Sequence, residues 1–159
     1  MAIGPTDLPS VLPTLRDRHA EGRIMGLDIG GRRIGVAVSD ETRLIATPVR
    51  FVERGSGDRQ AFRELIERYG VGRLVAGLPT GMSGREGPQA ADVRTYADRL
   101  ATELDLPMEY WDERLSTAIA ERTLIAGGTS RADRRTRVDA VAAAVILQGF
   151  LDHERYQGR

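Results

Sequence analysis

The chain of 159 residues contains no cysteine and no lysine, and its only histidines are His19 and His153. The absence of cysteine excludes disulfide bonds, a thiolate nucleophile and cysteine-ligated zinc. Because one histidine lies near each end, we expect neither a serine–histidine triad nor a three-histidine zinc site. The ionisable groups left for chemistry are mainly carboxylates and arginines, a combination that suits magnesium-like ions and phosphate.

The 23 basic residues are all arginines, and 23 acidic residues balance them to a net charge of zero. A guanidinium offers forked N–H donors to phosphate, although genome composition can also produce exclusive use of arginine. Without a net positive charge, no global field attracts nucleic acid. Only local clusters of arginine can therefore indicate nucleic-acid binding.

Long apolar segments are also missing: the longest run, Ala140–Leu147, is far shorter than the ~20 residues of a membrane-spanning helix. The first residues show no basic segment followed by an apolar one, so we expect no secretory signal, no membrane partner and a cytoplasmic location. The length and composition predict one folded domain at 23–153. Residues 1–22, which contain three prolines, are expected to be a poorly ordered or loosely packed arm, and 154–159 a C-terminal tail.

The first strong pattern lies at 24–39, where two apolar segments flank Gly30 and Gly31. This pattern predicts two antiparallel strands joined by a tight turn. Asp28 lies inside the first strand, where aspartate is uncommon. A buried carboxylate costs free energy unless it is paired or bound to a cation, so Asp28 suggests a divalent metal site.

The remaining chain alternates segments of strand and helix periodicity. Pro48 suggests that the third strand lies at an edge or contains a bend. After the strand at 44–52 we expect a helix around 62–69 that Gly70 and Gly72 end, and then strands at 73–78 and 107–111 separated by a helix around 93–104. The last elements expected are a helix capped by Ser116 or Thr117 and ended at 127–128, and a helix at about 139–152. This order predicts an α/β fold with a mixed five-stranded sheet, three antiparallel strands followed by two parallel ones, and helices on both faces.

Two further acids can reach the same sheet. Glu113 follows the strand at 107–111, at the carboxyl end where open α/β sheets place ligands, although alone it is better explained as a solvated partner of Arg114. Asp139 shares a helix face with Ala143 and Ile146, which should face the sheet, although aspartate is equally favoured as a helix cap. Together with Asp28, these acids can converge on one edge of the sheet.

Four segments resemble the YqgF/RuvX family and occur in the family's order between about 23 and 152. They are the hairpin 28–37, the loop Gly77-Leu78-Pro79 with Gly84, the block 112–117, and 138–143 with Ile146 and Leu147. These bacterial proteins have a ribonuclease H-like fold, are related to Holliday junction resolvases and are described as pre-16S ribosomal RNA nucleases. This chain departs from the family where Gly31 and Arg32 replace a common threonine and lysine.

The resemblance implies that Asp28, Glu113 and Asp139 are catalytic acids that hold one or two Mg²⁺ or Mn²⁺ ions. Such ions activate a water for attack on a phosphodiester and stabilise the leaving oxygen. The implied activity is that of a hydrolase, a metal-dependent nuclease acting on structured nucleic acid. Its first implied substrate is pre-ribosomal RNA, in 5′-end processing of pre-16S rRNA during ribosome biogenesis, and its second is branched DNA, for which a homodimer would suit the symmetry of a junction.

Arginines near these acids are candidate contacts to nucleic acid. Four of them precede Asp139 in a predicted basic loop, where they can clamp a phosphate backbone or remain a solvated loop partly neutralised by Asp133. The complete set of candidates is Arg32, Arg33, Arg85, Arg114, Arg131, Arg134, Arg135 and Arg137.

Two other functions compete with nuclease activity. The hairpin at 24–39 also resembles the first phosphate loop of actin-like and sugar-kinase ATPases, but those enzymes clamp ATP between two such domains and need far more than 159 residues. A non-catalytic nucleic-acid-binding or ribosome-assembly module would keep the fold without turnover. The presence of all three acids argues against that alternative, and metal-dependent cleavage separates the two.

Overall fold

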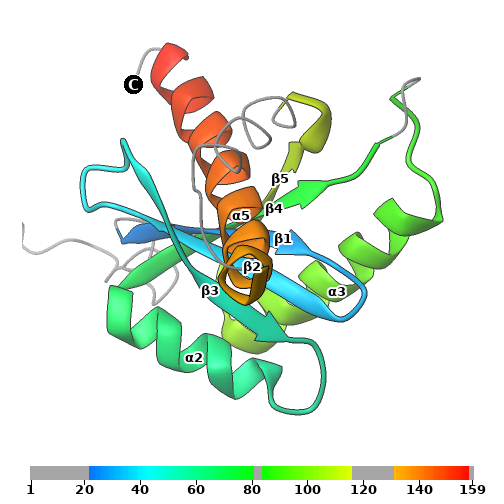
Figure 1. The fold of residues 1–159 in the computed structure, drawn as a ribbon. Coiled ribbons are helices and arrows are strands. Elements are labelled where there is room, and N and C mark those ends of the chain that lie inside the picture. The colour runs from blue at the N-terminus through cyan, green and yellow to red at the C-terminus, as the bar shows by residue number, and fades with distance from the viewer. Residues whose placement is uncertain (1–21, 81–83, 116–130, 158–159) are drawn as a thin grey trace, which may run out of the picture.

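The computed structural model describes residues 22–80, 84–115 and 131–157, with side chains from Asp139 onward in the last range. Five strands form one sheet in the order β3-β2-β1-β4-β5 (Figure 1). Their bounds are β1 Arg23–Ile29, β2 Arg33–Ser39, β3 Ala46–Glu53, β4 Val71–Leu78 and β5 Met108–Asp112. The strand β1 is antiparallel to β2 and parallel to β4, and β4 is parallel to β5. The predicted mixed sheet is confirmed.

The turn between β1 and β2 depends on a close approach of the backbone. The Gly30 N–H donates to the Arg33 carbonyl at 2.9 Å, and a Cβ on Gly30 would lie 2.8 Å from that same oxygen. Neither Gly30 nor Gly31 has a positive φ. Glycine is therefore needed at position 30 for space and not for a left-handed conformation.

The outer strand β3 carries Pro48, as the sequence predicts for an edge strand. The register between β2 and β3 shifts between Val36 and Ala37, and Ala37 pairs with Pro48. Proline has no N–H to give to the ladder, so an edge position next to a register shift is where a strand tolerates it. Both the edge and the irregularity expected from Pro48 are present.

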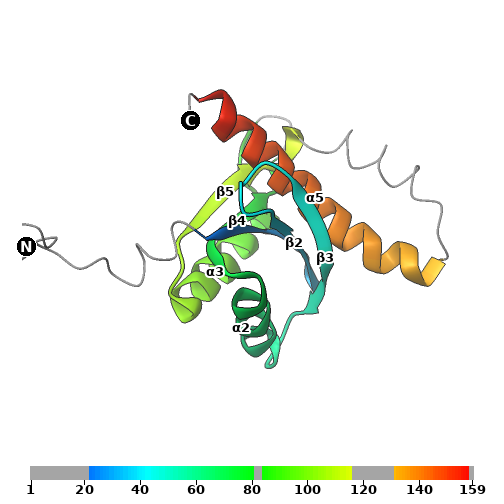
Figure 2. The same cartoon turned by 90° about the vertical axis from the view of Figure 1, so that its left-hand side faces the viewer.

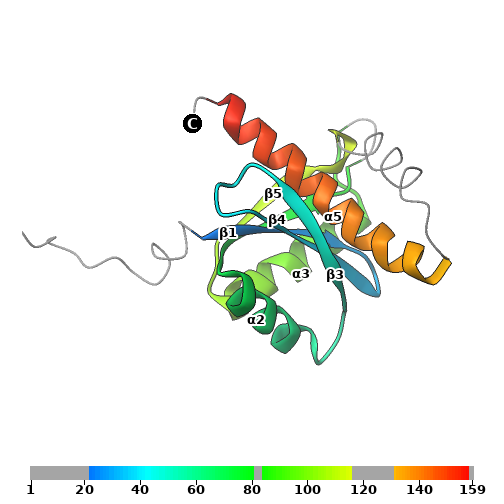
Figure 3. The same ribbon diagram turned by 60° about the vertical axis from the view of Figure 1, so that its left-hand side comes forward.

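Helices cover both faces of the sheet. Helices α2 (Asp58–Tyr69) and α3 (Pro88–Leu104) lie beneath one face, and α5 (Arg131–Tyr156) crosses the other (Figures 2 and 3). Alternate residues of β1 enter two separate cores: Met25 and Leu27 face α2 and α3, whereas Ile24 faces α5. Helix α2 ends where Gly70 takes the left-handed conformation, at a φ of 65°, as its sequence predicts.

Helix α5 is longer than the predicted range of 139–152. It begins at Arg131, so the part of the predicted basic loop from Arg131 to Arg137 is helical and the loop prediction is wrong there. Arginine is a good helix former, and no glycine or proline interrupts the segment. Asp139 consequently lies inside the helix, which rules out the alternative that it caps the helix. The helix expected after Ser116 lies outside the described residues.

The described residues contain no helix that combines the length and apolar character of a membrane span. Helix α5 instead packs its apolar side closely against glycines of the sheet. A Cβ on Gly35 of β2 would lie 1.8 Å from the Asp139 carbonyl oxygen, and one on Gly26 of β1 would lie 2.6 Å from the Leu147 Cβ. The sheet can approach α5 this closely only because these positions lack side chains.

We predict that Gly35→Ala destabilises the protein by about 3 kcal/mol, because the new methyl group meets the α5 backbone, which cannot rotate away. Gly31→Ala is the matched control, since no atom lies within 4 Å of its added Cβ. It should change the free energy of unfolding by less than about 0.5 kcal/mol. Urea unfolding followed by circular dichroism measures both. Equal unfolding midpoints for the two variants would show that the contact at Gly35 is unimportant.

Candidate active site

Asp28 lies on the face of the sheet that α5 covers. It follows Ile24 and Gly26 at two-residue spacing along β1, and both of those residues face α5. Across the ladder Asp28 pairs with Gly35, the position where α5 comes closest to the sheet. Because Gly35 has no side chain, α5 can approach the sheet here, and this places Asp139 near Asp28.

Glu113 reaches the same place from the end of β5. It is the first residue of a short 3₁₀ helix, η2 (Glu113–Leu115), directly after the strand. A Cβ on Gly77 of β4 would lie 3.0 Å from the Glu113 Oε1 and 2.5 Å from Ile146 Cδ1 of α5. The Glu113 side chain thus folds back over β4, between the sheet and α5, and forms a hydrogen bond with Asp28.

Burial perturbs both carboxyl groups of this pair. Burial, followed by the charge of Asp28 and the hydrogen bond to it, raises the pKa of Glu113 to about 7. Burial also raises the pKa of Asp28, the charge of Asp139 adds to that effect, and the hydrogen bond from Glu113 opposes it. Glu113 is therefore the proton donor and Asp28 the acceptor. Two acids that share one proton out of water form a site with excess negative charge once that proton leaves.

Asp139 has an unusual environment for a carboxylate. Its Oδ2 is buried and accepts no hydrogen bond, although Arg33 Nε of β2 lies 3.1 Å away. Carboxylate oxygens are ligands that Mg²⁺ and Mn²⁺ prefer, and a buried carboxylate oxygen with no hydrogen-bond donor is free to bind such an ion, so the donor set fits. Within residues 22–80, 84–115 and 139–157, however, no three acidic or histidine side chains are close enough together to hold one ion.

Asp112 organises the end of β5, a role that the sequence did not reveal. Its Oδ1 accepts hydrogen bonds from the Thr80 hydroxyl at 2.9 Å and from the Arg114 N–H at 3.0 Å. The Arg114 guanidinium adds bonds of 2.9 Å from Nε and 2.5 Å from Nη2 to Oδ2. These bonds, led by that of Arg114, lower the pKa of Asp112 to about 2. Asp112 thereby fixes the turn that carries Glu113, and an aspartate just before a helical turn was the available signal.

Arg54, which follows β3, is a second residue that sequence reasoning missed. Its Nη1 donates to the Gly30 carbonyl at 3.0 Å, and its guanidinium forms two hydrogen bonds with Asp92 of α3, at 2.8 and 2.9 Å. The same guanidinium lies 4.5 Å above the Tyr96 ring. Arg54 therefore connects the β1–β2 turn, which lies beside Asp28, to α3. No sequence motif predicts this contact.

The predicted nucleic-acid contacts fall into three groups. Arg32 and Arg33 line a hollow of about 770 Å³ beside Asp139. Arg114 is engaged by Asp112 and lies 3.5 Å from the position of a Cβ on Gly84, while Arg85 is exposed in the same loop. The side chains of the third group lie outside the described residues, and their roles stay predictions: Arg131, Arg134, Arg135 and Arg137.

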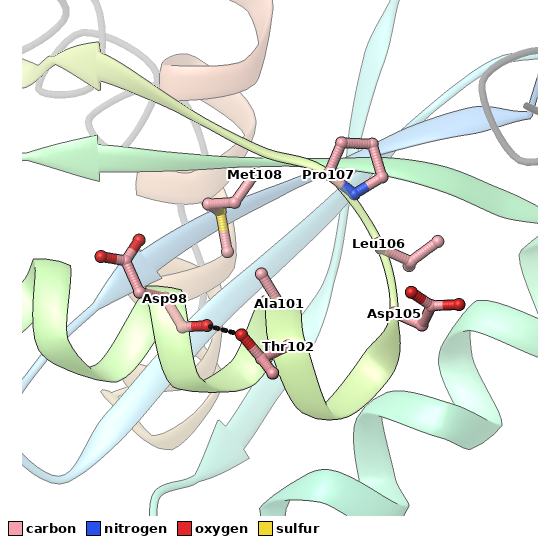
Figure 4. Close-up of a pocket in the computed structure, with 7 residues that line it drawn as sticks. All are labelled: Asp98, Ala101, Thr102, Asp105, Leu106, Pro107 and Met108. Carbon is pink, nitrogen blue, oxygen red and sulfur yellow. Dashed lines mark hydrogen bonds between the residues drawn. The ribbon is translucent and has the colours of Figure 1, made fainter. Parts of the chain in front are cut away.

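A separate hollow of about 430 Å³ lies where α3 leads into β5 (Figure 4). Its lining includes Asp98, Thr102 and Asp105 but no arginine, and the Thr102 hydroxyl donates to the Asp98 carbonyl at 2.9 Å. Met108, at the start of β5, also lines it, whereas Glu113 follows the end of that strand. This hollow is therefore remote from the carboxylates and unsuited to phosphate.

Comparison with known proteins identifies the family. The model of the family RuvX, described as "Holliday junction resolvase", matches residues 22–153. This chain belongs to the RuvX family. A relative from Paramagnetospirillum magneticum is 47% identical over 150 residues, covering 92% of this chain and 97% of its own. One from Symbiobacterium thermophilum is 49% identical over 132 residues, covering 82% and 92%. Each bears the name "Putative pre-16S rRNA nuclease".

Solved structures with the same fold include two junction resolvases. RuvC of Thermus thermophilus, in complex with a Holliday junction substrate, superposes with a TM-score of 0.52 at 15% identity, covering 84% of this chain and 96% of its own. The fowlpox virus resolvase in complex with Holliday junction DNA gives 0.51 at 10% identity, covering 83% and 98%. The predicted ribonuclease H-like fold and the predicted family are both confirmed for the RuvX chain.

We predict that Glu113→Gln removes a pH-dependent loss of stability. Between the ordinary pKa of 4.5 and the folded pKa of about 7, unfolded Glu113 has lost its proton while folded Glu113 keeps it. The unfolded state then binds fewer protons, so wild-type stability falls as pH rises through this window. Relative to the variant, the loss should reach about 1 kcal/mol, after allowance for the solvent that screens this half-buried group.

The measurement is urea unfolding of both proteins in EDTA at pH 5, 6, 7 and 8. Taking the difference between wild type and variant at each pH cancels the contributions of titrating groups that do not interact with Glu113, so the difference reports on the Asp28–Glu113 pair. A difference that stays constant from pH 5 to 8 would contradict a raised pKa at Glu113.

Proposed function

We propose that this RuvX chain is a metal-dependent nuclease that hydrolyses phosphodiester bonds of structured nucleic acid. One observation carries the proposal: Asp28, Glu113 and Asp139, from three elements far apart in sequence, gather between the sheet and α5. Asp58, the one acid of the described residues that is almost fully buried, lies apart from them, where it accepts a hydrogen bond from the Tyr96 hydroxyl and pairs with Arg99.

Mg²⁺ or Mn²⁺ would be held by Asp28, Glu113 and Asp139. When bound, such ions activate the attacking water and stabilise the leaving oxygen. The chain's own contribution is to keep these oxygens ready. Glu113 must give up the proton that it donates to Asp28, and Asp139 Oδ2 already lacks a hydrogen bond that would have to be broken. Asp112 holds the turn that carries Glu113, and Arg54 holds the turn that follows Asp28.

Nucleic acid would be held by arginines on two sides of the acids. Arg32 and Arg33 supply the wall of the hollow beside Asp139, and Arg85 and Arg114 lie in and beside the glycine-containing loop after β4. Guanidinium groups form paired hydrogen bonds with phosphate oxygens and thereby fix the register of a strand without reading its bases. The helical segment that carries Arg131, Arg134, Arg135 and Arg137 would extend this contact beyond Asp139.

We propose pre-16S ribosomal RNA as the substrate and its 5′-end processing as the reaction, acting in the cytoplasm. The names of relatives at 47% and 49% identity support this choice. Branched DNA is the second candidate. The description of the matching family and the junction complexes of proteins with the same fold favour it, and a homodimer would then match the symmetry of the junction.

We predict that Asp28→Asn lowers Mn²⁺-dependent cleavage at least ~100-fold, because an amide cannot supply the anionic oxygen that the ion requires. Glu41→Gln is the control. The Glu41 side chain is 85% exposed and follows the end of β2, whereas Asp28 pairs with Gly35 near the start of that strand. The Glu41→Gln variant should cleave as wild type does. The assay uses purified protein with an RNA that carries the 16S 5′ precursor sequence and, separately, with a four-way DNA junction.

The preferred substrate follows from the same assay. Faster cleavage of the RNA supports ribosomal processing, and faster cleavage of the junction supports the resolvase alternative. Retention of activity by Asp28→Asn would refute the metal-site proposal and point to a contaminating nuclease. Wild-type protein that binds structured RNA but never cuts either substrate would establish a binding module in its place.

A further inference from the structure

We infer that Arg33 is a positioning residue that holds Asp139 apart from the Asp28–Glu113 pair and releases it when a nucleic-acid phosphate takes over the guanidinium. This inference rests on the proposed function and deepens it, because it makes binding of the ion and binding of nucleic acid depend on each other.

The position of Arg33 follows from strand alternation. It opens β2 and lies on the same face as Gly35, two residues later, whose Cα supports the α5 backbone at Asp139. Its Nε lies 3.1 Å from Asp139 Oδ2, and its guanidinium carbon lies 5.1 Å from the centre of the Phe51 ring on β3. Arg33 therefore contacts one proposed ligand directly and has a second, uncharged surface to rest on.

The ion pair between Arg33 and Asp139 differs from the others around the sheet. Asp139 Oδ2 accepts no hydrogen bond in spite of the short separation, so the guanidinium N–H is not aligned with it. The other ion pairs among the described residues each include at least one hydrogen bond. Three of them, Arg54–Asp92, Arg94–Glu86 and Arg114–Asp112, are joined through two guanidinium nitrogens. A misaligned pair with 40% and 22% of its side chains exposed contributes little free energy and is easily broken.

Arg33 and a divalent ion compete for Asp139. Both are cations, and a guanidinium in contact with a ligand carboxylate repels an ion that binds there. No three acids in residues 22–80, 84–115 and 139–157 are close enough together to hold one ion, while Asp139 is engaged by Arg33. Closure of the three acids around an ion therefore requires Arg33 to leave.

The released guanidinium has a destination. Arg33 and its neighbour Arg32 both line the hollow of about 770 Å³ beside Asp139. A phosphate of the bound strand in this hollow accepts two parallel hydrogen bonds from a guanidinium, better geometry than Asp139 offers. A phosphate that draws Arg33 away frees Asp139 for the ion, and by linkage the ion strengthens binding of the strand by the same factor.

The test compares Mn²⁺ affinity of wild type, Arg33→Gln and Arg32→Gln, measured by electron paramagnetic resonance of free Mn²⁺ without nucleic acid. The two variants lose the same charge at adjacent positions, but of these two arginines only Arg33 forms an ion pair with Asp139. Arg33→Gln should bind Mn²⁺ about five- to tenfold more tightly than wild type, and Arg32→Gln should change the affinity less than about twofold. Circular dichroism checks that both variants fold.

A second experiment tests the effect of Asp139 on nucleic-acid binding. It measures the affinity for an RNA hairpin by fluorescence anisotropy in EDTA, so that no divalent ion is bound. Asp139→Asn should tighten RNA binding severalfold, because Arg33 is set free. Glu53→Gln is the control, since Glu53 lines the same hollow, is exposed and forms no ion pair among the described residues. The extra gain of Asp139→Asn should disappear when Arg33→Gln is also present.

Tighter Mn²⁺ binding by Arg33→Gln alone, together with loss of the Asp139→Asn gain in the double variant, supports the inference. Equal Mn²⁺ affinities of Arg33→Gln and Arg32→Gln would reduce the effect to the general field of a positive charge and overturn it. Unchanged or weaker Mn²⁺ binding by Arg33→Gln overturns it as well. Wild-type protein that binds no Mn²⁺ would refute the metal proposal itself, and this inference with it.

Discussion

The close approach of α5 to the sheet is the constraint on which the rest of the structure depends. At Gly35 a single methyl group would overlap the carbonyl of Asp139, and similar contacts occur at Gly26 and Gly77. The helix can therefore sit directly on the backbone of β1, β2 and β4. Because Gly35 pairs with Asp28, the same contact that packs the helix also places its carboxylate beside the strand carboxylate. Packing and chemistry share one set of atoms.

This arrangement has an energetic cost that the fold must offset. Burial raises the pKa of both Asp28 and Glu113, which means that their ionised forms are less stable at this site than in water. The two apolar cores on either side of the sheet supply the compensating burial, with residues such as Leu74 and Leu147 fully buried. Carboxyl groups whose pKa is raised by burial and by one another are typical of functional sites, so this pair points to a role in a reaction and not in folding.

Much of the fold was predictable because its signals are local. Two apolar segments around a pair of glycines predicted the hairpin, Gly70 predicted the end of α2, and Pro48 predicted an edge or a bend. The start of α5 was predicted wrongly because the charge of its arginines suggested a solvated loop, whereas the helix propensity of arginine, with no glycine or proline in the segment, favours a helix from Arg131. The error mattered, because it left open whether Asp139 was a cap.

The sequence supplied candidate residues for the site but not the contacts between them. Asp28 and Asp139 stood out because acids are rare on apolar faces, and Glu113 because it follows a strand. Nothing in the sequence joined Arg33 to Asp139 or Arg54 to Gly30. Those contacts depend on the register of two strands and on the depth of a helix, which are tertiary properties. The register also separates the arginines by role. Arg54 and Arg114 each form hydrogen bonds through two guanidinium nitrogens and fix the neighbouring turns. Arg33 instead pairs with Asp139 without a hydrogen bond and lies over the Phe51 ring. An arginine that fixes a turn needs aligned hydrogen bonds, as Arg54 and Arg114 have. An arginine that has to exchange a carboxylate for a phosphate, as we infer for Arg33, needs a contact that breaks easily.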